Sequence, residues 1–128
     1  SYSNDLGVNQ SIEFAGLKNA SEIREYMSDS HIFLLSSYQE GMPRALLEAL
    51  SFGMPVVSSD VGGVYEVIPK NYLFPCGNIL QAKDIVHALI NEGLEEVSKR
   101  NVAISKQFIG DEIKSSYESY FNFLKLSK

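Results

Sequence analysis

The sequence is poor in cysteine and in basic residues, and it has no tryptophan. Its single cysteine, Cys76, cannot form an internal disulfide or a cysteine-based zinc site, and we interpret it as a small core or rim residue. Eleven Lys and Arg stand against sixteen Asp and Glu, which gives a net charge of -5, and the basic residues are scattered. Nothing therefore supports general binding to nucleic acid or to an anionic membrane, and a nucleic-acid role is close to excluded.

Long apolar runs are also missing. No run approaches the roughly 20 residues that cross a bilayer, and the first ten residues lack the basic end and apolar stretch of a signal peptide. We therefore expect a cytoplasmic protein. The 128 residues are 45% hydrophobic and 21% charged, which indicates one soluble globular domain. Because a strand-like pattern follows the non-periodic first ten residues directly, we expect the chain to begin in mid-domain.

Strand patterns and helix patterns alternate along the chain. Residues 11–16 alternate apolar and polar side chains up to Gly16, and residues 31–35 and 55–60 are apolar runs typical of parallel strands buried on both faces. A further short strand fits residues 71–76. Helical spacing or helix formers predict helices over residues 21–30, 43–53, 64–68, 78–92, 94–108 and 111–126, with Ser21 and Asp111 as caps. This order predicts an α/β fold, a Rossmann-like parallel sheet with helices on both faces.

The loop over residues 36–43 carries the richest set of polar groups. Ligands of open parallel sheets bind beyond the carboxyl ends of the strands, where this loop is expected. Glu40 and Gly41 come directly before a helix with Pro43 in its first turn, and the first amides of a helix favour an anion. Arg44 in this first turn opposes the helix dipole unless a negative ligand is bound. The alternative is that Arg44 is a solvated side chain.

Two other features could serve the same ligand. Gly62 and Gly63 follow the strand at residues 55–60, and their bare backbone could approach a phosphate, although a simple turn is the alternative. Glu48 could share a helix face with Ala45 and Ala49 that looks back to the strand ends, because leucines occupy the core-facing positions. A carboxylate there could accept hydrogen bonds from a ribose diol. The alternative is a solvated helix edge.

The run from Glu40 to Gly63 closely resembles the donor-site signature of the group 1 glycosyltransferases, glycosyltransferase family 4. The segment around Phe14 and the last helix also resemble the family. The resemblance implies that residues 1–128 form the later part of the C-terminal nucleotide-sugar-binding domain, one truncated half of a GT-B fold. The N-terminal acceptor domain and the phosphate-binding Arg and Lys of the family are then expected outside this chain.

The resemblance implies a retaining glycosyltransferase that moves a sugar from a nucleoside diphosphate sugar to an acceptor, in surface polysaccharide or glycolipid synthesis. It assigns Glu40 to catalysis beside the transferred sugar and Glu48 to the ribose hydroxyls. It assigns the remaining donor contacts to Gly41, Met42, Pro43, Arg44, Gly62, Gly63, Gly16 and Leu17, the last two beside the base. His31 and Ser36 depart from the family pattern, and we interpret both as structural.

The resemblance also defines the expected partners. The donor is a substrate, with UDP-sugar favoured over GDP-sugar, and neither a metal nor a cofactor is implied. The acceptor sugar or lipid-linked glycan would be held by the N-terminal domain, with the full-length enzyme at the inner face of the membrane and the isolated fragment inactive. The alternative is a non-catalytic nucleotide-binding or interaction module on the same scaffold. A dinucleotide-dependent oxidoreductase ranks low, because no G-x-G-x-x-G follows a strand.

Overall fold

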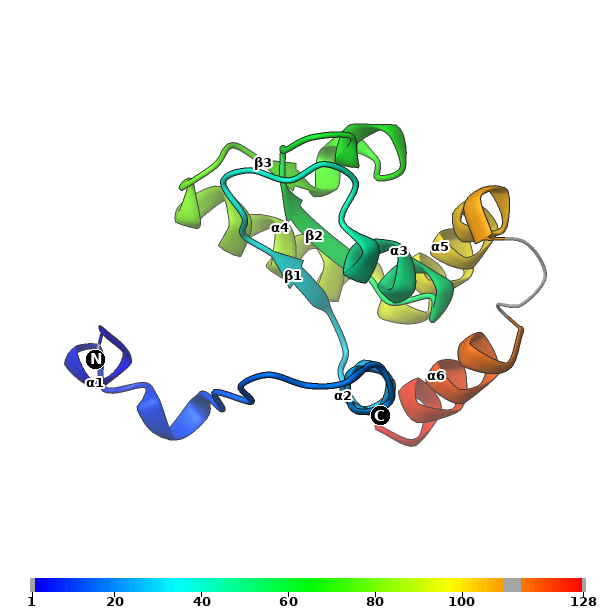
Figure 1. The fold of residues 1–128 in the computed structure, drawn as a ribbon, viewed down its shortest axis with the longest axis horizontal. Helices are drawn as coiled ribbons and strands as arrows, with labels where there is room; N and C mark the ends of the chain where they lie inside the picture. The colour runs from blue at the N-terminus through cyan, green and yellow to red at the C-terminus, as the bar shows by residue number, and fades with distance from the viewer. Residues whose placement is uncertain (1, 110–113, 128) are drawn as a thin grey trace.

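A three-stranded parallel sheet lies at the centre of the protein (Figure 1). The computed structural model describes residues 2–109 and 114–127. The sheet has the order β1-β2-β3, with β1 at Phe33–Leu35, β2 at Val56–Ser59 and β3 at Leu73–Phe74. Leu34 pairs with Val57, and Ser59 pairs with Phe74. Because all three strands are parallel, their carboxyl ends lie at the same end of the sheet.

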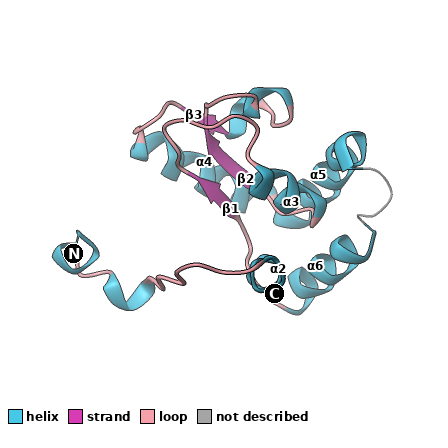
Figure 2. Cartoon of the chain, viewed as in Figure 1, coloured by secondary structure: helices cyan, strands magenta, loops and turns pink. Residues whose placement is uncertain are grey.

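Strand β2 is buried along its whole length. Successive side chains of a strand point to opposite faces of the sheet, so both faces of β2 are covered. Helix α3 (Arg44–Ser51) packs against β1 and β2, and helix α4 (Ile79–Glu92) packs against β2 and β3 (Figure 2). The predicted Rossmann-like α/β class is confirmed.

The remaining long helices complete the core. Helix α5 (Leu94–Ile109) packs on α3 and α4, and α6 (Lys114–Leu126) packs on α5 and α2 (Ala20–Ser28). The Tyr120 hydroxyl donates to the backbone carbonyl of His31 at 2.7 Å, and burial raises the pKa of this phenol. This bond ties α6 to the chain that enters β1. None of the helices in the described residues is long and apolar enough to cross a membrane.

The helix caps differ in detail from the prediction. The cap of α2 is Asn19 rather than Ser21: its side chain accepts from the Glu22 amide at 3.0 Å, and the Glu22 carboxylate accepts from the Asn19 amide at 2.9 Å. This reciprocal capping box satisfies two amides that Ser21 could not reach. Pro43 is the N-cap of α3 rather than a first-turn residue. The predicted cap Asp111 lies outside the described residues.

The short elements fall mostly where helix or strand was predicted. Residues 64–68 contain the 3-10 turn η2 (Val64–Glu66), and residues 71–76 contain β3. The turn η3 (Lys70–Tyr72) precedes β3. The chain begins with α1 (Tyr2–Asp5) and the 3-10 turn η1 (Asn9–Ser11), where no helix was predicted.

Two strand predictions were wrong. Residues 12–16 form no strand, and the Phe14 and Leu17 side chains are largely in solvent. No described strand lies beside this segment (Figure 1), and an alternating pattern cannot form a ladder without a partner. Strand β1 was predicted to be buried on both faces, but Leu34 is 53% exposed. Phe33 and Leu35 are half-buried, and their side chains point to the opposite face, so the core covers one face of β1 better than the other.

A polar cluster links the turn η3 to helices α4 and α5. The Tyr72 hydroxyl donates to Glu92 Oε2 at 2.6 Å, and Arg100 donates to Glu92 Oε1 at 2.9 Å and also to the Tyr72 hydroxyl. The hydrogen bonds from Tyr72 and Arg100 hold the pKa of Glu92 below its usual value of 4.5, because both favour the charged carboxylate. The cluster therefore stabilises the fold more strongly while Glu92 is ionised.

The lowered pKa of Glu92 predicts a pH-dependent stability difference. A group with a lowered folded pKa stabilises the protein above its unfolded pKa, and this contribution is lost as the pH falls through the folded value. The Glu92→Gln variant should therefore be less stable than the wild type at pH 7, by up to about 1 kcal/mol for a solvent-exposed pair. Urea denaturation should show this difference shrinking toward pH 3. A difference that stays constant over this range would contradict the assignment.

The buried side-chain amide of Asn101 predicts a larger loss of stability when it is replaced. Asn101 Nδ2 in α5 donates to the Met54 carbonyl at 2.6 Å, just before β2 begins. Asn101→Leu keeps the branching at Cγ but leaves this carbonyl unsatisfied, so we expect a loss of about 1–3 kcal/mol in the free energy of unfolding. The matched control is Asn91→Leu at an exposed position of α4, which should change stability by less than about 0.5 kcal/mol. Equal effects of the two substitutions would refute the prediction.

Candidate functional site

The three strand ends converge on the backbone carbonyl of Ser37. This carbonyl accepts a hydrogen bond from Ser59 Oγ, at the end of β2, at 2.6 Å. Cys76, in the loop after β3, places its Sγ at 3.8 Å from the same oxygen. Figure 1 shows the loop after β1 arching over this edge of the sheet. The loop that carries Glu40 is thus anchored to the end of β2 and contacts the loop after β3.

The turn at Gly62 and Gly63 packs directly on the backbone of Glu40 and Gly41. Gly62 has a φ of +53°, and a Cβ at this position would overlap the carbonyl oxygens of both Glu40 and Gly41. The Gly63 amide donates to the Gly41 carbonyl at 3.2 Å. The structure therefore brings four of the predicted site residues together, and it uses the bare backbone of Gly62 for loop packing. The predicted contact of Gly62 and Gly63 with phosphate stays a prediction.

The carboxylate of Glu40 is oriented by a neighbouring hydroxyl. Ser37 Oγ donates to Glu40 Oε1 at 2.8 Å, and the Glu40 side chain is half-buried. Within the described residues no partner is found for Oε2, which leaves this oxygen available to a ligand. The sequence reasoning missed Ser37, although the S-x-x-E spacing is one at which a hydroxyl reaches back to a carboxylate within a single turn.

The start of α3 lacks a side-chain cap. Pro43 takes an extended conformation with φ -68° and ψ 119°, and its carbonyl accepts from the Leu46 amide at 3.2 Å and from the Leu47 amide at 3.4 Å. The earlier amides of this turn have no intrahelical carbonyl to bond, as at any helix start. Arg44 is exposed in the first turn. The arrangement can accept an anion.

Glu48 lies one turn further along α3. Its side chain is half-buried, and none of the described residues forms a hydrogen bond or ion pair with its carboxylate. Ala49 was predicted to share the ligand-facing surface with Glu48, and this was wrong, because Ala49 is fully buried with Leu46 and Leu50. The helical spacing turns Ala49 toward the core while Ala45 remains exposed.

The predicted base-contacting residues lie apart from this group. Gly16 has open space around it, and Leu17 is fully exposed in the extended segment before α2 (Figure 1). Met42, by contrast, lies at the site, with its terminal methyl group beside Gly63. The structure brings together residues 40–43 with Gly62 and Gly63, and it does not bring Gly16 and Leu17 to them. Their role beside the nucleotide base stays a prediction.

The other candidate groups have simpler surroundings. Cys76 is exposed, so the core alternative for it is wrong. His31 is exposed and its Nε2 lies 3.1 Å from Ser127 Oγ, which agrees with a structural role. In the part of the chain that the structure describes, no cluster of three His, Cys, Asp or Glu residues could hold a metal ion.

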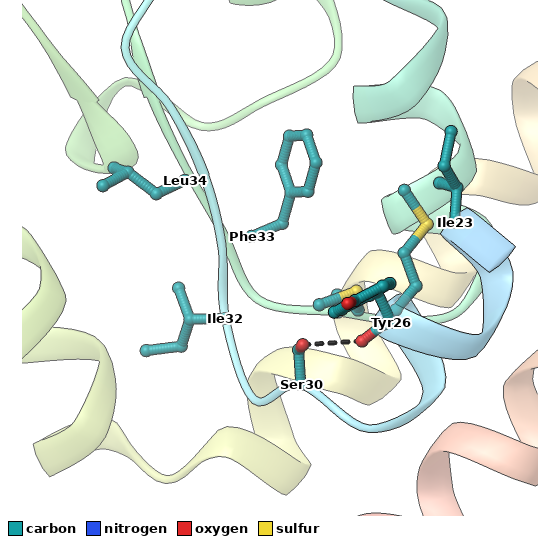
Figure 3. A pocket seen from close by; sticks show the side chains of 8 residues that line it. Ile23, Tyr26, Ser30, Ile32, Phe33 and Leu34 are labelled. Carbon is teal, nitrogen blue, oxygen red and sulfur yellow. Dashed lines mark hydrogen bonds between the residues drawn. The ribbon is translucent and has the colours of Figure 1, made fainter. Parts of the chain in front are cut away.

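An apolar pocket of about 240 Å³ lies between α2 and β1 (Figure 3). Figure 3 shows Phe33 and Leu34 on the strand, and Ile23 and Tyr26 on the helix, around this space. The Ser30 hydroxyl donates to the Tyr26 carbonyl at its rim, at 2.6 Å. None of the predicted donor residues lines the pocket, so it is separate from the Glu40 loop.

The fold and the site together define a Rossmann-like α/β domain with an acidic, glycine-containing loop at the carboxyl ends of its strands. The family described as "Glycosyl transferases group 1" matches residues 1–107. The chain belongs to this family, as its sequence resemblance predicts.

Several curated relatives are glycosyltransferases by name. The chain is 34% identical over 102 residues to the amylovoran biosynthesis glycosyltransferase AmsK of Erwinia amylovora, across 73% of the chain and 25% of the relative. It is 38% identical over 60 residues to the gpi3 subunit of phosphatidylinositol N-acetylglucosaminyltransferase of Schizosaccharomyces pombe, across 47% of the chain and 13% of the relative. It is 28% identical over 134 residues to N-acetyl-alpha-D-glucosaminyl L-malate synthase of Bacillus anthracis, across 97% and 34%. The chain thus spans about a third or less of these relatives.

The contact at Gly62 predicts that replacing this glycine strongly destabilises the fold. Gly62→Ala adds a methyl group that overlaps two backbone carbonyls and also strains a left-handed residue. Overpacking costs about 1–3 kcal/mol and left-handed strain about 1–2 kcal/mol, so we expect a total loss of about 2–5 kcal/mol in the free energy of unfolding. Chemical denaturation measures this loss.

The matched control is Gly7→Ala. Gly7 has a φ of +68°, yet no atom lies within 4 Å of an added Cβ. This variant should lose only the contribution of left-handed strain, about 1–2 kcal/mol of the free energy of unfolding. If the two variants are equally destabilised, the packing of Gly62 against the Glu40 loop is not what requires glycine there.

Proposed function

We propose that this chain forms the donor-binding part of a retaining glycosyltransferase, which moves a sugar from a nucleoside diphosphate to an acceptor. The observation that carries the proposal is the Glu40 carboxylate, held by Ser37 beside the uncapped start of α3, in a chain of this family. We assign residues 1–128 to the nucleotide-sugar-binding domain and the acceptor site to an N-terminal domain outside this chain. The short coverage of the relatives agrees with such a further domain.

Each predicted group has a role in this proposal. Glu40 contacts the transferred sugar through the carboxylate oxygen that Ser37 leaves open. The backbone at Gly41, Met42 and Arg44 receives the diphosphate, and Glu48 accepts hydrogen bonds from the ribose hydroxyls. Support for the Glu48 role comes from its half-buried carboxylate, for which the described residues provide no partner.

The proposed reaction exchanges one bond at the anomeric carbon for another. The bond from this carbon to the diphosphate oxygen breaks, and the diphosphate keeps the electron pair. The acceptor hydroxyl oxygen forms the new bond, and its proton passes to an oxygen of the departing diphosphate. Negative charge therefore grows on the diphosphate, and helix-start amides and the cationic Arg44 can stabilise it without reorganising. The proposal requires no metal and no cofactor from this chain.

The donor and the setting are finer parts of the proposal. We take UDP-sugars as the donors to test first, and a sugar or lipid-linked glycan as the acceptor. The names of relatives in amylovoran synthesis and phosphatidylinositol glycosylation support polysaccharide or glycolipid synthesis. Such acceptors fit an enzyme that works in the cytoplasm at the inner face of the membrane.

The sharpest test of the donor site is Glu48→Ala. Hydrogen bonds to a charged group contribute about 1.5–3 kcal/mol, so the variant of the full-length enzyme should bind UDP roughly ten to a hundred times more weakly. Calorimetric titration measures the affinity. Because the described residues provide Glu48 with no partner, its loss should leave the melting temperature almost unchanged.

The matched control is Glu25→Ala, which removes an exposed carboxylate from α2 and should change neither quantity. A Glu48→Ala variant that binds UDP like the wild type would exclude the ribose role. A lowered melting temperature with unchanged affinity would make Glu48 a structural residue. If the wild type itself binds no nucleotide, the alternative of an interaction module on this scaffold is favoured.

A further inference from the structure

The Ser37 hydroxyl is the described side-chain group that holds the Glu40 carboxylate. It donates to Glu40 Oε1 at 2.8 Å, and it does so from a half-buried position directly after β1. A glutamate side chain has three rotatable bonds, and an unheld carboxylate in a loop would sample several positions. The hydrogen bond selects one of these positions before any ligand arrives.

Ser37 is itself held from the neighbouring strand. Its carbonyl accepts from the fully buried Ser59 hydroxyl at 2.6 Å, and Cys76 Sγ lies 3.8 Å from the same oxygen. The position of the Ser37 hydroxyl is therefore set by the rigid end of β2 and not by the loop alone. A catalytic carboxylate must be held close to its productive geometry by residues that are themselves fixed, which this arrangement provides.

The backbone of Glu40 is held by the turn at Gly62 and Gly63. Gly62 packs against the carbonyls of Glu40 and Gly41, and the Gly63 amide donates to Gly41 at 3.2 Å. With the main chain held in this way, the side-chain torsions of Glu40 are what remains free. The hydroxyl of Ser37 acts on that remaining freedom.

We propose that Ser37 is the positioning residue for Glu40, and that Ser59 transmits the rigidity of β2 to it. This inference rests on the proposed function of Glu40 and adds to it a residue that does not touch the sugar. Ser37 directs Oε1 inward, so that Oε2 is presented to the substrate. Its removal should affect the rate of sugar transfer through misplacement of Glu40, while donor binding through Glu48 and the α3 amides remains.

The test uses the full-length enzyme with UDP-glucose, UDP-galactose and UDP-N-acetylglucosamine. Water serves as the sugar acceptor, and release of UDP is measured. Ser37→Ala should lower kcat and kcat/KM together by about tenfold, because small misplacements of a catalytic group are costly. Ser37→Thr keeps the hydroxyl and should restore most of the rate. The matched control is Ser36→Ala, which alters the exposed neighbouring serine and should leave the rate within about twofold.

A double-substitution cycle separates positioning from a general structural effect. In the Glu40→Ala background, Ser37→Ala should have no further effect on the residual rate, because the group that it positions is gone. Two outcomes would overturn the inference. In the first, Ser37→Ala lowers the rate in the Glu40→Ala background as much as in the wild type. In the second, Ser37→Ala alone keeps a rate within twofold of the wild type while Glu40→Ala is impaired. If Glu40→Ala retains the full rate, the proposed function of Glu40 fails instead.

A crystal structure of Ser37→Ala provides a readout that is independent of turnover. The Glu40 carboxylate should occupy more than one position, with the backbone at Gly41 and Gly62 unchanged. A single, wild-type-like carboxylate position would overturn the inference even if no UDP-sugar proves to be a substrate. Thermal melts of both serine variants should agree within a few degrees, which keeps the comparison free of unfolding.

Discussion

Strand β2 is completely buried, and both the core helices and the loop of the candidate site are held in place by it. Both faces of the strand are covered, and both of its ends are held by hydrogen bonds to backbone carbonyls. Before the strand, Asn101 reaches across from α5 to Met54. At its last residue, the Ser59 hydroxyl donates to the Ser37 carbonyl. The core helices and the loop at the candidate site thus both contact the short strand β2. A shift of β2 would therefore move both.

The site shows how a loop can be made rigid with little secondary structure. Glu40 lies in a segment without helix or strand, yet this loop is held at three points. The Glu40 side chain accepts from Ser37 within the loop, the Glu40 backbone packs on Gly62, and the Ser37 carbonyl accepts from Ser59 of β2. A short local contact is entropically cheap to form, whereas contacts between separate strand ends require the whole sheet. The chemistry proposed for this loop therefore depends on a correctly formed sheet, although none of the residues proposed to bind the ligand lies in a strand.

Local pattern predicted most of the fold, and non-local pairing accounts for the errors. Apolar spacing was sufficient for α4 and α5, because a helix is defined by its own residues. The alternating residues 12–16 satisfy a strand pattern but have no neighbouring strand in the described structure. At the site, the glycines and glutamates were identified from the sequence. Two contacts were not predicted: the close packing that requires glycine at position 62, and the hydrogen bond from Ser59 to Ser37. Each joins residues about twenty positions apart, which a local pattern does not reveal.

The close approach of the Gly62 turn to the Glu40 loop also limits how this site can diverge in evolution. Two backbones that touch without an intervening side chain tolerate neither an inserted residue nor a deleted one in either loop, because the register of the contact would be lost. Changes in donor preference must then arise from side chains on a fixed frame. Close to these two loops in the sequence, Tyr38, Met42 and Tyr65 have exposed side chains. Variation among related chains should therefore concentrate at such positions, while the lengths of the two loops stay constant.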